Sequence, residues 1–340
     1  MKQVWISKAG PPEVLVCREG QEPPIHAGEV KIRVEASGVN FADVIGRLGI
    51  YPDAPSMPYV PGYEVAGSVI DVGQGVTELK MGDKVLALTR FNGYSEVVCV
   101  PHKLVFKRLE WMSAQHAAAL PVNYLTAYQC LLGMGSLKPG EKLLIHNAAG
   151  GVGVAALDIA KIIGAETYGT ASPGKHEFLR QRGLHHPIDY RQYDYERVVR
   201  ELTNGKGVHL ILDPLGGVNW QKNYRLLMPT GRLVYFGASA AAPGKRRSLF
   251  RVLRWLGNMR LYNPLRLMND NKAIVGVNIV HLFDHAELLR PWMNQIIEWY
   301  DEALFRPHVD KVFAFADAAA AHHYLQDRQN KGKLLLQPTL

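Results

Sequence analysis

Cysteine is scarce in this chain. Only three of its 340 residues are cysteines, Cys17, Cys99 and Cys130, and they lie far apart. An odd number of widely separated cysteines argues against a disulfide framework and against a Cys-x-x-Cys metal site. We therefore expect reduced thiols and a cytoplasmic protein.

Long uncharged apolar runs are also scarce. The N-terminus, MKQVWISKAGPPEVLV, alternates as a strand does and lacks the apolar stretch of a signal peptide. Residues 117–137 carry no charge, but Pro121, Asn123 and Gln129 within them are costly in lipid. For this stretch we predict a buried helix and no membrane span.

Acidic residues are fewer than basic ones. The chain has 31 Asp and Glu against 39 Lys and Arg, a formal charge of +8. This balance suits an anionic ligand, and it would equally suit weak attraction to nucleic acid or acidic lipid. No nucleic-acid-binding motif accompanies the charge, so nucleic acid is not expected as a partner. With 47% hydrophobic residues, the chain has the composition of an ordinary globular protein.

One stretch, residues 141–175, has the order strand, tight turn, helix and strand that a βαβ unit requires. Its turn is a variant of G-x-G-x-x-G and reads Ala148, Ala149, Gly150, Gly151, Val152, Gly153. Gly150 would let the backbone approach a pyrophosphate, and Gly153 would let the helix pack closely on its strand. The helix N-terminus would then offer unpaired N–H groups to the phosphates.

The end of the second strand of this unit lacks the acidic residue of an NAD site. Such a site places Asp or Glu about 20 residues beyond the glycines to bind the ribose 2′-hydroxyl. Here the chain has Thr170, Ala171 and Ser172, followed by Lys175. A hydroxyl and an ammonium suit a 2′-phosphate, which favours NADP(H) over NAD(H). In the alternative interpretation, Lys175 merely starts the next helix on a solvated face.

The pattern of the chain changes near residue 120. Residues 1–120 show short alternating runs punctuated by glycine and proline, which predicts a mostly antiparallel, barrel-like β domain. Residues 121–284 alternate between strand and helix, which predicts an α/β domain with a parallel sheet covered on both faces. Residues 285–340 are expected to return to the first domain. The segment 38–64 is too irregular for a core element, and such segments are usually functional.

Seven basic residues and no acidic one lie between Gly244 and Asn269. They are Lys245, Arg246, Arg247, Arg251, Arg254, Arg260 and Arg266. The apolar residues interleaved with them would surround a helix and do not form one clean face. It fits a lid over a substrate cleft, a membrane-surface helix, or a packed helix pair with a solvated basic face.

Taken together, several segments resemble the medium-chain dehydrogenase/reductase superfamily and, within it, the zinc-free quinone oxidoreductase branch. In chain order they are GVNFADV, PGYEVAG, VGQGV, GDKV, AAGGVG and GTASPGKHE. The stretches PVNYLTAYQ, HPIDYRQYDY and DPLGG are closest to the subgroup typified by the synaptic vesicle amine-transport protein homologue. The resemblance implies a GroES-like catalytic domain, a Rossmann domain with a doubly wound parallel sheet, and a cleft between them.

The departures from the zinc-dependent branch concern the metal ligands. The alcohol dehydrogenases would have a cysteine where this chain has Asn40 and a histidine where it has Tyr63, and the four-cysteine structural loop is missing. No metal ligand is therefore predicted. An alcohol is hard to oxidise without a metal to lower its pKa. A quinone or an α,β-unsaturated carbonyl needs only a nearby hydride and a proton afterwards.

The resemblance therefore implies an NADPH:quinone oxidoreductase or an enone reductase. Two alternatives stay open, namely an NADPH-binding regulatory protein that associates with a membrane or a partner, and a zinc alcohol dehydrogenase. The last predicted strand of the parallel sheet, at 273–277, is apolar and would be an exposed edge in a monomer. In similar proteins this edge pairs across a two-fold axis, so a homodimer is expected.

Residue roles also follow from the resemblance. Gly150, Gly151, Val152 and Gly153 would hold the pyrophosphate, Ser172, Lys175 and Tyr190 the 2′-phosphate, and Asn40, Tyr51, Gly237 and Asn278 the nicotinamide and its ribose. Asn40, Tyr51 and Tyr63 form the expected catalytic set. In it the two tyrosines are candidate hydrogen-bond donors to the substrate oxygen, although a buried tyrosine is more often a satisfied core group.

Overall fold

The computed structural model describes residues 1–217, 219–241, 244, 255, 257 and 262–338. These residues divide into two compact units. Unit 1 takes its residues from 1–125 and 280–338 together with Gly244, and unit 2 takes its residues from 126–241 and 255–279. Most of the basic stretch predicted at 244–269 lies outside the described residues.

Unit 1 is built on a seven-stranded sheet in the order β14-β15-β3-β4-β5-β7, with β6 also paired to β3. All its pairs are antiparallel except that of β14 with β15, which confirms the mostly antiparallel region predicted from the sequence. The strands are β3 (Glu29–Val39), β4 (Glu64–Val72), β5 (Lys84–Leu88), β6 (Val97–Pro101), β7 (Val105–Lys107), β14 (Val309–Ala314) and β15 (Lys333–Gln337). A separate hairpin pairs β1 (Lys2–Ile6) with β2 (Leu15–Glu19).

The segment 38–64 contains a helix that the sequence analysis missed. Helix α1 (Phe41–Arg47) begins at Asn40, which forms a capping box with Asp43. Val44 and Leu48 are buried, so the prediction that this segment is too irregular for a core element is wrong. Between α1 and the start of β4 at Glu64, the segment has only turns, bends and an isolated bridge of Tyr59 with Ile6.

The single helix predicted over 117–137 is also wrong in form. The chain makes α2 (Ala114–Ala118), α3 (Pro121–Tyr128) and a π-helical turn (Gln129–Gly133). Proline has no N–H and is favoured in the first turn of a helix, so Pro121 starts a new helix there. No helix in the described part of the chain is long and apolar enough to cross a membrane.

The other helices of unit 1 lie in its C-terminal part and in short turns. These are α10 (Ala286–Asp301), α11 (Ala318–Gln326) and the 3₁₀ helices η1 (Pro12–Val14), η2 (His102–Leu104) and η7 (Phe315–Asp317). A further 3₁₀ helix, η6 (Ile279–Leu282), falls at the passage from unit 2 back to unit 1.

Unit 2 is a six-stranded parallel sheet in the order β10-β9-β8-β11-β12-β13. Its strands are β8 (Lys142–Ile145), β9 (Glu166–Ala171), β10 (His186–Asp189), β11 (Val208–Asp213), β12 (Leu227–Tyr235) and β13 (Ala273–Gly276). The order reverses between β8 and β11, which makes the sheet doubly wound as predicted. Its central strands are buried apolar runs, because helices cover both faces.

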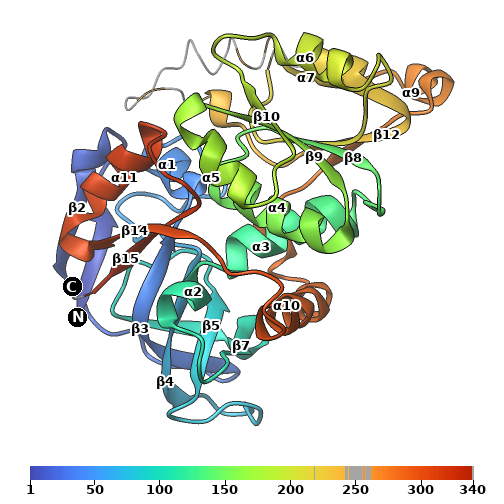
Figure 1. Ribbon diagram of the computed structural model, residues 1–340. Coiled ribbons are helices and arrows are strands. Elements are labelled where there is room, and N and C mark those ends of the chain that lie inside the picture. Colours follow the sequence, from blue (N-terminus) through green and yellow to red (C-terminus); the bar gives the residue numbers. More distant parts are fainter. Residues whose placement is uncertain (218, 242–243, 245–254, 256, 258–261, 339–340) are drawn as a thin grey trace. The chain divides into compact units, whose positions relative to one another are not determined.

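The helices of unit 2 connect successive strands. They are α4 (Gly151–Ile163), η4 (Pro173–Lys175), α5 (His176–Gln181), α6 (Tyr195–Leu202), α7 (Asn219–Leu226), η5 (Ser239–Ala241) and α9 (Pro264–Asp270). Figure 1 shows α4 and α5 on one face of this sheet and α6 and α7 side by side on the other. Because all six strands are parallel, their carboxyl ends lie at the same edge of the sheet, which we call the nucleotide edge.

Candidate active site and nucleotide edge

The glycine turn lies where β8 ends and α4 begins. A Cβ atom on Gly153 would lie 2.5 Å from the carbonyl oxygens of both Asn147 and Ala148, so only glycine lets the helix sit this close to its strand. Gly150 is the N-cap of α4 and makes no side-chain cap to the helix. The N–H groups of the first turn are thus left to an incoming ligand, and this cradle fits a pyrophosphate.

The three residues predicted for the 2′-phosphate lie at the ends of neighbouring strands. Ser172 follows β9, and its carbonyl accepts the backbone N–H of Lys175 at 3.0 Å. Strand β10 pairs with β9 so that Asp189 lies opposite Ala171, and Tyr190 is the next residue. Ser172 and Lys175 are half-buried and Tyr190 is exposed, and all three follow the carboxyl ends of two paired strands.

Two further basic residues at this place were missed by the sequence analysis. His176 begins α5, and its Nε2 lies 3.2 Å from the carbonyl oxygen of Ala171. The guanidinium carbon of Arg191 lies 6.0 Å from the centre of the Tyr190 ring. Their signal was present, since each directly follows a predicted phosphate ligand in the sequence. The Arg191 guanidinium adds positive charge near the expected 2′-phosphate, and the His176 ring adds a polar group.

Gly237 and Asn278 belong to the same edge. Gly237 comes two residues after the end of β12, and Asn278 two residues after the end of β13. Both are exposed. The structure therefore brings the predicted nucleotide contacts of unit 2 to one edge, and it places Asn40, Tyr51 and Tyr63 in unit 1.

In unit 1, Asn40 is buried and its amide is engaged by two charged groups. Its Nδ2 donates to Oε1 of Glu64 at 2.9 Å, and its Oδ1 accepts from Nζ of Lys333 at 2.7 Å. Lys333 also forms an ion pair with Glu64. The sequence analysis missed Glu64 and Lys333 as site residues; the available signal was a lysine within the apolar strand KLLLQ.

Glu64 joins four parts of unit 1. Its Oε1 accepts from Asn40 and Lys333, and its Oε2 accepts from the backbone N–H of Val122 at the start of α3, at 2.7 Å. A Cβ atom on Gly38 would collide with this carboxylate. The side chains of Lys333 and Glu64 are only 3% and 0% exposed. Within the described residues, no group of three or more His, Cys, Asp or Glu is placed to hold a metal ion.

Tyr51 and Tyr63 pack edge to face, with ring centres 6.3 Å apart and planes at 85°. Tyr63 is buried and Tyr51 is half-buried. Burial, together with the charge of Asp43 and a hydrogen bond with Tyr51, raises the pKa of Tyr63 far above its usual value. Tyr63 therefore stays protonated and is suited to donate a hydrogen bond, not to exchange its proton.

Asp43 holds the backbone around these residues. Its carboxylate accepts from the N–H of Asn40 at 2.8 Å, the N–H of Gly62 at 2.9 Å and the hydroxyl of Tyr94 at 3.0 Å. Full burial raises the pKa of Asp43 to about 7 even though these hydrogen bonds favour the charged form. Asp43 thereby holds Asn40 and Gly62 together, and Gly62 directly precedes Tyr63 in the sequence.

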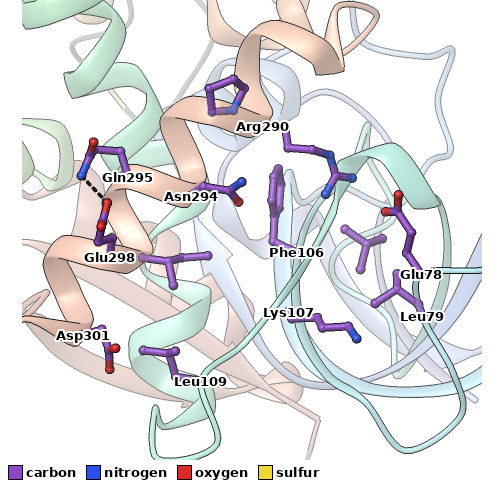
Figure 2. Close-up of a pocket in the computed structure, with 13 residues that line it drawn as sticks. Glu78, Leu79, Phe106, Lys107, Leu109, Arg290, Asn294, Gln295, Glu298 and Asp301 are labelled. Carbon is purple, nitrogen blue, oxygen red and sulfur yellow. Dashed lines mark hydrogen bonds between the residues drawn. The ribbon is translucent and has the colours of Figure 1, made fainter.

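A separate open groove lies on unit 1 between α10 and β7, with a volume of about 670 Å³ (Figure 2). It combines the cations of Lys107 and Arg290 with the carboxylates of Glu78, Glu298 and Asp301. The Arg290 guanidinium is already bonded to the carbonyl oxygens of His102 and Lys103. None of the predicted site residues lines this groove, so it is distinct from both sites described above.

A parallel-sheet unit with a glycine turn at its carboxyl edge, joined to an antiparallel β unit, is the architecture of a two-domain, nucleotide-dependent oxidoreductase. The family comparisons agree. Residues 26–110 match the alcohol dehydrogenase GroES-like domain, and residues 182–336 match the zinc-binding dehydrogenase family. The chain belongs to the medium-chain dehydrogenase/reductase superfamily, as its motifs predicted.

Curated relatives resemble the chain over most of its length. The synaptic vesicle membrane protein VAT-1 homolog of Rattus norvegicus is 39% identical over 325 residues, which cover 95% of this chain and 80% of that protein. The quinone oxidoreductase of Pseudomonas aeruginosa is 32% identical over 339 residues, 99% of both chains. The predicted resemblance to the quinone oxidoreductase branch and to the VAT-1 subgroup is confirmed.

Solved structures share the fold. The Escherichia coli quinone oxidoreductase complexed with NADPH matches with a TM-score of 0.88 and 29% identity over 99% of this chain and 100% of that one. The CurK enoyl reductase matches with a TM-score of 0.85 and 28% identity over 99% and 98%. The two-domain fold predicted from the sequence is confirmed. NADPH, the cofactor type predicted here, is the cofactor in the Escherichia coli structure.

Proposed function

We propose that this protein is an NADPH-dependent reductase that transfers hydride to a quinone or an α,β-unsaturated carbonyl and needs no zinc. The observation that carries the proposal is the Lys333 ammonium, which is bonded to Asn40 where the zinc branch has a cysteine ligand. This ammonium already engages the amide oxygen of Asn40 and the carboxylate of Glu64, so neither oxygen is left to ligate a divalent cation. The quinone oxidoreductases and the enoyl reductase among the similar proteins support the class of acceptor.

In this proposal the nucleotide edge binds the cofactor, which supplies the hydride when bound. The N–H groups at Gly151, Val152 and Gly153 bind the pyrophosphate, while Ser172, Lys175 and Tyr190 bind the 2′-phosphate. Gly237 and Asn278 line the nicotinamide end. Holding donor and acceptor in line supplies roughly 7–11 kcal/mol of the barrier, so positioning is most of the catalysis.

Unit 1 contributes the groups for the acceptor. We assign Tyr51 as the hydrogen-bond donor to the acceptor oxygen, because it is the more accessible of the two phenols. Tyr63 is buried against it and orients it. Asn40 acts mainly by holding the start of α1, since Glu64 and Lys333 engage its amide.

Turnover tests the proposal directly. NADPH oxidation is measured against panels of naphthoquinones and alkenals. We expect turnover with at least one acceptor of these classes. Tight NADPH binding without turnover of any acceptor would leave the regulatory alternative in place of an enzyme.

The cofactor preference has a separate test. Lys175→Ala should weaken NADPH by about tenfold and leave NADH almost unchanged, since only NADPH carries the 2′-phosphate that the ammonium binds. Lys161→Ala, which removes an equal charge from the exposed end of α4, is the matched control and should change neither affinity. Equal losses for the two cofactors would place the 2′-phosphate site elsewhere.

Zinc independence is tested by metal analysis of the purified protein. We expect less than one zinc in ten chains, and activity that survives a chelator. One zinc per chain would favour the zinc alcohol dehydrogenase alternative.

A membrane-associated role is the second candidate, because several of the similar proteins are named synaptic vesicle membrane proteins. The basic stretch 244–269 motivates it, and it lies mostly outside the described residues. Co-sedimentation with anionic vesicles should fall when its arginines are neutralised. Binding that does not fall would exclude this stretch as the lipid contact.

A further inference from the structure

A chain of buried hydrogen bonds runs beneath the nucleotide edge of unit 2. It starts at the glycine turn, where the backbone N–H of Asn147 donates to Oγ1 of Thr170 at 3.3 Å. Thr170 Oγ1 lies 3.2 Å from Nδ1 of His146, and Nε2 of His146 lies 2.9 Å from Oδ1 of Asn223. Thr170, His146 and Asn223 are all buried.

This series of buried hydrogen bonds ends at the loop after β11. Asn223 Nδ2 donates to Oδ2 of Asp213 at 2.8 Å. The other oxygen of Asp213 accepts the backbone N–H groups of Leu215 and Gly216, at 2.7 and 3.0 Å. The carbonyl of Pro214 in this loop accepts from the N–H and the hydroxyl of Ser239, which begins η5 two residues after Gly237.

With a neutral His146 ring, only one arrangement of hydrogens satisfies these hydrogen bonds. A carboxylate can only accept, so the amide nitrogen of Asn223 must face Asp213 and its oxygen must face His146. His146 is then protonated at Nε2, and its Nδ1 accepts the hydroxyl hydrogen of Thr170. Burial lowers the pKa of His146 and so keeps the ring neutral, as this arrangement requires. Asn223 therefore stands at the centre of the chain.

We propose that Asn223 is a positioning residue for the nucleotide, because it joins His146 and Asp213 and so holds the loops after β8 and β11 in one geometry. Asn223 lies on α7 and is fully buried. It therefore acts on the two loops from beneath and not at their exposed surface. The inference rests on the proposed NADP(H) site at this edge. It concerns the pyrophosphate end of that site and not the 2′-phosphate end.

The decisive variant is Asn223→Leu, which has similar size and no hydrogen-bonding group. Its binding to NADPH should weaken about tenfold, because the two loops lose their common support. Adenosine 2′-monophosphate contains the 2′-phosphate but no pyrophosphate, so its binding should change less than about twofold. Amide hydrogen exchange should quicken at residues 147–150 and 214–217 and stay unchanged in β8 and β9.

Tyr195→Phe is the matched control. The Tyr195 hydroxyl also donates to Asn223 Oδ1, at 2.9 Å, but it is not one of the links between Asn147 and Gly216. Its removal therefore leaves that series of hydrogen bonds intact. We expect both affinities of this variant to stay within about twofold of the unchanged protein. An equal effect of Tyr195→Phe and Asn223→Leu would overturn the proposal, as would parallel losses of NADPH and adenosine 2′-monophosphate binding.

If Asn223→Leu does not fold, Thr170→Val decides the matter. This substitution removes the hydrogen bonds of Thr170 with Asn147 and His146, keeps the shape of the residue and leaves the hydrogen bonds of Asp213 in place. It should quicken exchange at 147–150 but not at 214–217, and unchanged exchange at 147–150 would contradict the proposal. If the unaltered protein does not bind NADPH, the proposed function fails, while the exchange measurements still show whether Asn223 couples the two loops.

Discussion

His322 and His323 are adjacent on α11, and the fold treats them differently. His322 is buried, and its Nδ1 accepts from Nε of Arg47 at 3.3 Å. His323 is half-exposed and is bonded to Glu13. Burial first, and then the charges of Arg47 and His323, hold the pKa of His322 well below its usual value. The folded protein therefore keeps this ring neutral.

We predict that His322 makes the stability of the protein fall at acidic pH. Below about pH 6.5 a histidine in the unfolded chain takes up a proton, while His322 in the folded chain does not. The unfolded state then binds more protons, so the free energy of unfolding decreases as the pH falls through this value. His322→Gln should reduce the loss of stability between pH 7.5 and pH 5.5, measured by urea unfolding at both values.

His323→Gln is the control for this prediction, since it changes the neighbouring ring on the same helix. It removes only the last of the three causes that lower the pKa of His322, so most of the pH dependence due to His322 should remain. Some dependence should also remain in His322→Gln, because the pKa of the buried His146 is lowered as well. The prediction is wrong if His322→Gln loses as much stability between the two pH values as the unaltered protein.

Among the helices and strands of unit 1, four are connected through the buried ion pair of Glu64 with Lys333. Lys333 begins β15, Glu64 begins β4, Asn40 caps α1, and Val122 is in the first turn of α3. We predict that Lys333→Met destabilises the protein by about 3–5 kcal/mol, because it leaves the Glu64 carboxylate buried without its counter-charge. Urea unfolding at pH 7.5 measures the loss.

Two comparisons test the origin of that loss. The double variant Glu64→Gln with Lys333→Met should recover much of it, since no uncompensated charge remains. Lys84→Met breaks the exposed pair with Glu110 and should have a far smaller effect, because solvent screens that pair. If Lys84→Met costs as much as Lys333→Met, the buried charge is not the cause.

The sequence predicted those elements whose signal is local. The glycine turn at 148–153 and the strand and helix that flank it depend on residues within one βαβ unit, so spacing and hydrophobic period were sufficient to find them. Helix α1 was missed because glycine and proline surround it and because Asp43, not Glu or Gln, completes its capping box. The contact of Lys333 with Asn40 joins residues 293 positions apart, and it depends on the pairing of β15 with β3. No local pattern carries such information, so the charged group bonded to Asn40 became visible only in the structure.

At the scale of the whole molecule, the edge strand β13 predicts a dimer. It is the last strand of its sheet and pairs with β12 on one side. The preceding helix α9 exposes Leu265 and Met268 by 62% and 65%. An apolar edge of this kind invites pairing with another strand, and a second copy of the chain presents the same edge.

We therefore expect light scattering to give twice the chain mass of 37.9 kDa. Replacing both Ile274 and Val275 by lysine should yield monomers, since like charges from the two copies would face each other across the two-fold axis. Leu202→Lys, on the exposed surface of α6, is the control and should leave the dimer intact. A double variant that keeps twice the chain mass, with its circular dichroism unchanged, would show that β13 is not the interface, and the apolar surface of α9 would then need another explanation.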